Sequence, residues 1–112
     1  MDLEDSEKGE QQTFRVSCIG YCRDTNVHLA VQSGDADLYA REGEPPKIEN
    51  SNCNDCPMCK SRSSNLEDAC SGLATMEGDI FFVAVVAHKP FRGGTLTVTG
   101  YNLKNVTVFS TE

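Results

Sequence analysis

Apolar and polar residues alternate along several short segments of the chain. Phe14 and Val16 alternate with polar neighbours, and Val27, Leu29 and Val31 repeat the same pattern further along. Side chains of a β-strand point to opposite faces in turn, so a strand with one buried face shows this period of two. The two segments therefore predict two half-buried strands.

The longest apolar run, residues 80–87, has eight residues and is rich in β-branched and aromatic side chains. It is too short for a stable helix and predicts a central strand. A turn is predicted over residues 88–94, which contain a proline and two adjacent glycines. Leu96 and Val98 then alternate with threonines in a further strand.

The whole pattern predicts an all-β, jelly-roll-like sandwich of about seven to eight short antiparallel strands. A slip of one residue in any strand would exchange its inner and outer faces, so the expected core depends on register. The residues on the inward positions form the predicted core: Phe14, Val16, Val27, Leu29, Val31, Leu38, Phe81, Val83, Val85, Leu96 and Val98.

Three segments fall outside the alternating pattern. Residues 44–74 are polar and contain four of the six cysteines, so we expect a long loop that is stapled by disulfides. Residues 1–11 contain five acidic residues and one large apolar residue, Leu3, and predict a solvated tail or linker. An acidic segment that folds back to bind a cation is the alternative. Residues 102–112 predict a C-terminal strand or a linker.

The charge of the chain excludes some partners. The 112 residues carry a net charge of -7, with 17 acidic and 10 basic residues. Nucleic acids and anionic membrane surfaces attract basic proteins, so neither is an expected partner. No apolar run approaches the roughly 20 residues of a membrane-spanning helix, so membrane insertion is not expected either.

Six cysteines in a chain of this length are typical of an oxidising compartment. Cys53, Cys56, Cys59 and Cys70 also have a spacing found in zinc and iron–sulfur sites, and an intracellular zinc-binding domain is an alternative. The compartment argument favours disulfides, for which six cysteines allow 15 pairings. Since the acidic N-terminus is not a signal peptide, we expect a module of a longer secreted or cell-surface protein.

Two stretches resemble a known family. Residues 33–46 are SGDADLYAREGEPP, and residues 81–98 are FFVAVVAHKPFRGGTLTV. Both resemble the bacterial pre-peptidase C-terminal domain, the PPC-like sandwich found beside secreted proteases, which is related to the collagen-binding domains of clostridial collagenases. The resemblance covers residues 12–101 and implies a non-catalytic domain.

The resemblance also implies a disulfide pairing. Cys53, in NSNCND, and Cys70, in NLEDAC, match the two paired cysteines of the family. We therefore expect a Cys53–Cys70 bond. Proximity in the chain favours Cys18–Cys22 and Cys56–Cys59 as local closures.

Calcium is the one cofactor that the residues suggest. Asp35 and Asp37 are hard oxygen donors beside a turn, and on an extended strand both carboxylates point to one face. Their repulsion requires a cation or hydrogen-bond donors, and Arg41 is a local donor. The alternative is that Asp35 only caps the turn. In some PPC-like domains an acidic N-terminal linker and acids near this turn bind calcium, so the resemblance implies further ligands from Asp2, Glu4 and Asp5.

The expected function is a non-catalytic extracellular binding or adhesion module, whose partner is a protein, a polysaccharide or a neighbouring domain. Val86, Phe91 and Tyr101 are the candidate contact surface. Val86 replaces a tyrosine of the family hairpin, which weakens an inherited collagen or glycan function. Asn105 begins an N-glycosylation sequon. No catalytic motif occurs, so an enzyme is not expected, and an accessory domain that assists the folding or secretion of a neighbouring enzyme is the alternative.

Overall fold

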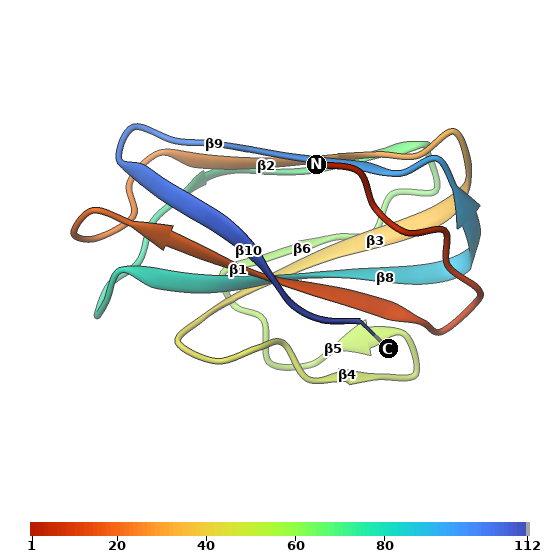
Figure 1. Ribbon diagram of the computed structural model, residues 1–112. Helices are drawn as coiled ribbons and strands as arrows, with labels where there is room; N and C mark the ends of the chain where they lie inside the picture. Colours follow the sequence, from red (N-terminus) through yellow and green to blue (C-terminus); the bar gives the residue numbers. More distant parts are fainter. Residues whose placement is uncertain (112) are drawn as a thin grey trace.

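The computed structural model describes residues 1–111 as antiparallel β-sheets packed into a sandwich (Figure 1). The predicted all-β class is confirmed. The described residues contain no helix, and therefore none long and apolar enough to cross a membrane. The strands are β1 (Gln11–Cys18), β2 (Thr25–Ala30), β3 (Ser33–Glu42), β4 (Ile48–Glu49), β5 (Asn52–Cys53), β6 (Cys59–Ser61), β7 (Glu67–Leu73), β8 (Ile80–Arg92), β9 (Thr95–Thr99) and β10 (Leu103–Thr111).

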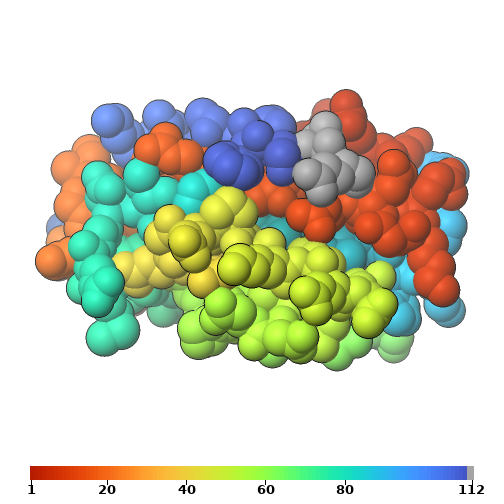
Figure 2. Space-filling model, turned by 90° about the horizontal axis from the view of Figure 1, so that it is seen from below, coloured from red at the N-terminus to blue at the C-terminus, as the bar shows by residue number. Residues whose placement is uncertain are grey.

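Eight of these strands form the two layers of the sandwich. The larger sheet has the order β10-β1-β8-β3-β6, and the smaller sheet has the order β7-β2-β9. The short β4 and β5 form a separate hairpin below the larger sheet (Figure 1). Seen from below, the segment that contains this hairpin, in yellow and green, covers much of that face (Figure 2).

β8 lies at the centre of the larger sheet and is buried on both faces. Phe81 and Val83 belong to the core between the sheets, whereas Ala84 and Val86 pack in a second cluster with Tyr39. This second cluster includes both cysteines of the β4–β5 region and the side chain of Ile48. A strand with two covered faces must be apolar throughout, which explains the uninterrupted run over residues 80–87.

The predicted turn over residues 88–94 is wrong for most of its length, because β8 continues to Arg92. The ladder between β3 and β8 shifts register at this point, opposite Gly34. Proline has no N–H and is tolerated in a strand where the ladder is interrupted, so Pro90 lies within β8. Only the Gly93–Gly94 pair forms the turn.

The predicted core is confirmed. Ten of its eleven residues are buried, and Val98 is partly buried against the same cluster. The inward positions were predictable because the alternation of side chains depends only on the local backbone.

The N-terminal segment is not the predicted solvated tail. Its backbone pairs with residues at the end of β8 and the start of β9, at Phe91 and Thr95, and Leu3 is buried with 8% of its surface exposed. The N–H of Leu3 donates to the Gly94 carbonyl at 2.9 Å. The segment is therefore an N-terminal strap that closes one side of the sandwich.

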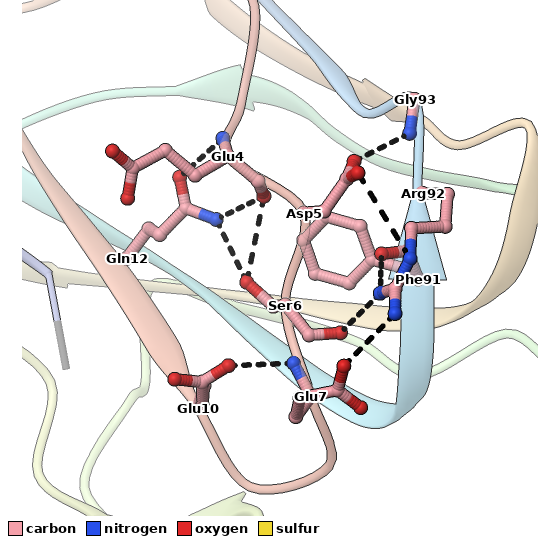
Figure 3. A network of polar contacts seen from close by, with 9 residues as sticks. All are labelled: Glu4, Asp5, Ser6, Glu7, Glu10, Gln12, Phe91, Arg92 and Gly93. Atoms are coloured by element: carbon pink, nitrogen blue, oxygen red, sulfur yellow. Dashed lines mark hydrogen bonds and ion pairs between the residues drawn. The ribbon is translucent and has the colours of Figure 1, made fainter.

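Polar contacts hold the rest of the strap (Figure 3). The Arg92 guanidinium donates to Glu7 Oε1 at 2.8 Å and lies 3.9 Å from Asp5 Oδ2. The Gln12 side chain accepts from the Glu4 N–H at 3.1 Å and donates to the Glu4 carbonyl at 2.7 Å. The Gln12 contacts satisfy backbone groups of Glu4 that a free tail would leave to water.

The disulfide pairing differs from the one that the family resemblance implied. The Cys18–Cys22 closure is confirmed, but Cys53 is joined to Cys56 and Cys59 to Cys70. The Cys53–Cys70 and Cys56–Cys59 pairings are therefore wrong. Cys53 lies in the cluster on the outer face of the larger sheet, whereas Cys70 lies in the core between the sheets, so the two side chains occupy different layers.

The C-terminal segment is a strand rather than a linker. β10 pairs with β1 as the edge of the larger sheet, where Val106 lies opposite Val16. Phe109 on β10 contacts Phe82 on β8 edge-to-face, with ring centroids 5.0 Å apart. Together, the strap and β10 extend the sandwich beyond the predicted domain limits of residues 12–101.

Candidate metal centre

Three buried carboxylates from strands of the two sheets meet in one cluster. Asp35 and Asp37 come from β3 and Asp68 comes from β7, and one oxygen of each lies within 4.8 Å of the other two. The exposed fractions of the three residues are 8%, 2% and 4%. Ionised carboxylates are rarely buried without partners, so this cluster is the most distinctive polar feature of the structure.

The backbone of β3 brings Asp35 into the cluster. Gly34 has a φ of +94°, and a Cβ atom at this position would lie 2.0 Å from the Pro90 carbonyl oxygen. Only glycine fits this close approach to β8. The ladder also shifts register between Asp35 and Ala36. The register shifts add the extra residues to β8 rather than to β3, so the proximity of Asp35 and Asp37 is consistent with the predicted placement of both carboxylates on one face of β3.

The Cys59–Cys70 disulfide brings Asp68 to the same place. It joins β6, which pairs with β3 opposite Leu38, to β7. Asp68 lies two residues before Cys70 on the same face of β7, and its Oδ1 accepts from the Ser61 hydroxyl at 2.7 Å and from the Ser63 N–H at 2.8 Å. The last residue of β6 and the loop after it thus fix the orientation of the Asp68 carboxylate.

The other two carboxylates have fewer partners. The Arg62 guanidinium lies 4.0 Å from Asp37 Oδ2, at the limit of an ion pair. Asp35 Oδ1 is completely buried and has no hydrogen-bond partner among the described residues. A buried oxygen without a donor costs free energy unless another group, such as a cation, contacts it.

The electrostatics of the cluster reflect this shortage of positive charge. Burial, followed by the charges of Asp35 and Asp68, raises the pKa of Asp37 from 3.8 to about 6, although His88 and Arg62 oppose the rise. Burial also raises the pKa of Asp68, against the hydrogen bonds from Ser61 and Ser63. Both carboxyl groups therefore hold their protons more strongly than exposed ones do.

The donor set fits a hard divalent cation. Calcium takes six to eight oxygen ligands and prefers carboxylates, which bind through one or both oxygens. Asp35, Asp37 and Asp68 supply up to six such oxygens, and the orphaned Asp35 Oδ1 is available for one of these contacts. A bound cation would offset the repulsion among the three carboxylates and favour their ionised forms.

The acidic N-terminal residues do not join this cluster, contrary to what the resemblance implied. Asp2, Glu4 and Asp5 lie in the strap, and Asp5 accepts from the Gly93 N–H at 3.0 Å. Arg41 does not reach the cluster either, because it pairs with Glu44 at 2.9 Å and with Asp55 at 2.7 Å.

Asp68 was missed at the sequence level. The available signal was its position two residues before the buried Cys70, which places both on one face of a strand. The other two carboxylates, however, lie on β3, far from Asp68 in the chain, and no local pattern indicates that they meet it.

The predicted contact surface of Val86, Phe91 and Tyr101 does not exist. Val86 is buried under the β4–β5 region, and Phe91 is buried in the core beside the strap. Tyr101 alone is exposed, and the Arg23 guanidinium lies 5.5 Å from its ring centroid. Asn105 is exposed on β10, as a glycosylation site requires.

Comparison of the chain with protein-family models, with curated protein sequences and with solved structures found no match. The observations therefore define a class rather than a family. The chain is an all-β sandwich with three disulfides, which is consistent with an extracellular location, and three carboxylates from strands of both sheets form one buried cluster.

Proposed function

We propose that the chain is a non-catalytic extracellular binding module that binds calcium and is stabilised by it in the folded state. The unpartnered Asp35 Oδ1 in the cluster with Asp37 and Asp68 carries this proposal, because a positive ligand stabilises a buried anionic oxygen that has no donor. Calcium is the hard cation that is abundant outside cells, where disulfides also persist.

The proposed calcium site is structural rather than catalytic. Its carboxylates join β3 of the larger sheet to β7 of the smaller sheet, and all three are nearly inaccessible to a substrate. Calcium bound there stabilises the sandwich because it binds only the folded arrangement. The disulfides use all six cysteines, so no thiolate remains for the zinc alternative.

The module presents its partner-binding surface on this stabilised scaffold. A protein, a polysaccharide or a neighbouring domain is the proposed partner, and a relationship to PPC-like domains is part of the proposal. N-glycosylation of Asn105 is a further part, since this side chain is exposed on an edge strand.

Thermal unfolding of metal-stripped protein, with and without millimolar calcium, tests the proposal. The expected result is a melting temperature that rises with calcium and does not rise in Asp37→Asn. Glu49→Gln is the matched control, because it removes one exposed carboxylate outside the cluster and retains the calcium response. A wild-type melting temperature that calcium leaves unchanged would overturn the calcium site.

A further inference from the structure

A second feature, distinct from the carboxylate cluster, is an open cleft of about 540 Å³ on the outer side of the larger sheet. It lies where the end of β3, the β7–β8 loop and the start of β8 meet. A smaller hollow of about 240 Å³ adjoins it and shares Glu42 and Met76. The residues that line the cleft are Glu42, Gly43, Met76, Glu77, Gly78, Asp79, Ile80 and Phe82.

The floor of the cleft is apolar. It contains Ile80 and Phe82, and the Phe82 ring is held by its edge-to-face contact with Phe109. Met76 stands beside the floor with 84% of its surface exposed, the largest exposed fraction among the large apolar side chains of residues 1–110. A methionine adapts its shape to different apolar partners, so this edge suits contact with another molecule.

The wall of the cleft is preformed. The Glu42 carboxylate accepts from the backbone N–H groups of Met76 and Glu77, each at 2.7 Å. The Thr75 N–H donates to the Cys22 carbonyl at 3.1 Å, and the Cys22 N–H donates to the Thr75 hydroxyl oxygen at 2.8 Å. The β7–β8 loop is therefore tied on both sides, and a ligand would pay little entropy to order it.

The rim of the cleft is acidic. Glu42, Glu77 and Asp79 line it, and no basic residue does. Within residues 1–110, no basic group forms an ion pair with Glu77 or Asp79. Arg15 and Arg41 flank Phe82 on the neighbouring strands, but Arg41 is already paired with two carboxylates. In the described part of the chain, Arg15 is the one flanking base without an ion pair, and the three carboxylates of the cleft outweigh it, so the cleft keeps a net negative charge.

We propose that this cleft binds a cationic amphipathic segment of a partner protein, in which a lysine or arginine stands beside a large apolar side chain. The apolar side chain packs on Phe82 and Met76, and the cation lies at the rim near Glu77 and Asp79. Charge complementarity at the rim supplies specificity, and the buried apolar contact supplies affinity. The inference rests on the proposed binding role but not on calcium.

Backbone amide shifts of the isotope-labelled, disulfide-intact chain test this inference. The probe is the peptide acetyl-Leu-Lys-Leu-Lys-amide, and acetyl-Leu-Glu-Leu-Glu-amide is its charge-reversed control. The lysine peptide is expected to shift amides of residues 76–82 and of Glu42, and the glutamate peptide is expected to shift none of them. Because two rim carboxylates are lost in Glu77→Gln/Asp79→Asn, the Kd of the lysine peptide should rise about fivefold.

A second double variant separates specific binding from general attraction to an acidic protein. Asp2→Asn/Glu49→Gln removes the same charge at exposed positions outside the cleft and should leave the Kd unchanged within about twofold. Equal losses in the two double variants, equal binding of both peptides, or shifts confined to other residues would overturn the inference. The calcium response of Glu77→Gln/Asp79→Asn is measured in the same samples, so failure of the peptide site is distinguishable from failure of the calcium site.

Discussion

Cys59 and Cys70 are joined by a disulfide that ties β6 of the larger sheet to β7 of the smaller sheet. The bond holds Asp68, two residues before Cys70, against Asp35 and Asp37 of β3. The same cross-link therefore stabilises the fold and assembles the candidate metal centre.

Removal of this disulfide in Cys59→Ser/Cys70→Ser is expected to lower the free energy of unfolding by about 3 kcal/mol. The unfolded chain gains conformational entropy when this loop is no longer closed. Urea denaturation measures this change. The variant should also lose its calcium response, since Asp68 is no longer held.

The Cys53→Ser/Cys56→Ser variant is the control for the metal centre. It removes a disulfide that lies in the outer cluster, so it should lose stability but retain the calcium response. A full calcium response in Cys59→Ser/Cys70→Ser would contradict the role of that bond in placing Asp68.

Asp37→Asn is expected to stabilise the metal-free protein near neutral pH. The substitution removes a buried charge that two neighbouring carboxylates repel, while it keeps the size of the side chain. Chemical denaturation in the presence of a chelator measures the gain. If the variant is instead less stable than the wild type without metal, Asp37 makes favourable contacts that outweigh its burial and repulsion.

The pH dependence of the metal-free protein follows from the raised pKa of Asp37. The folded pKa of about 6 exceeds the ordinary value of 3.8, so the folded protein binds the proton more tightly than the unfolded chain. This contribution to stability is fully present below about pH 4 and is lost as the pH rises through 6.

Other carboxylates have their own pH dependence, so the measured quantity is the difference between the wild type and Asp37→Asn. The stability of the wild type relative to the variant should fall between pH 4 and pH 7. A difference that stays constant over this range would show that Asp37 titrates as an exposed carboxyl group does.

Gly34→Ala is expected to destabilise the protein by at least 2 kcal/mol, since the added Cβ meets the Pro90 carbonyl at a φ of +94°. Gly78→Ala is the matched control, because a Cβ atom at Gly78 has no atom within 4 Å. Thermal unfolding of both variants checks the comparison. Similar melting temperatures of Gly34→Ala and Gly78→Ala would show that β8 moves away from β3 without a loss of stability.

Leu3→Ala tests whether the N-terminal strap belongs to the fold. The side chain is buried beside Gly94 and Phe91, so its truncation should cost roughly 2–3 kcal/mol. Glu7→Gln removes only an exposed ion pair with Arg92 and should cost less than about 1 kcal/mol. If both Leu3→Ala and Glu7→Gln leave the free energy of unfolding unchanged, the strap adds no stability.

The sequence by itself determined the inner faces of β1, β2, β8 and β9, but not β6 and β7, which lie in the segment that was expected to be a loop. The alternation of Phe14 with Val16, and of Val27 with Leu29, indicates burial because side-chain direction in a strand is a property of the local backbone. The apolar run of β8 indicated a central strand because a strand that is covered on both faces is apolar throughout. Asp35 and Asp37 were recognisable as candidate ligands from their chemistry alone.

Only the tertiary structure decided which distant segments meet. The bonds of Cys53 to Cys56 and of Cys59 to Cys70 depend on the layer in which each side chain lies, which spacing along the chain does not encode. Leu3 is buried because Phe91 and Gly94, far away in the chain, leave room for it. Asp68 completes the carboxylate cluster because packing of the two sheets places β7 beside β3, and such contacts are set by the whole fold rather than by any local pattern.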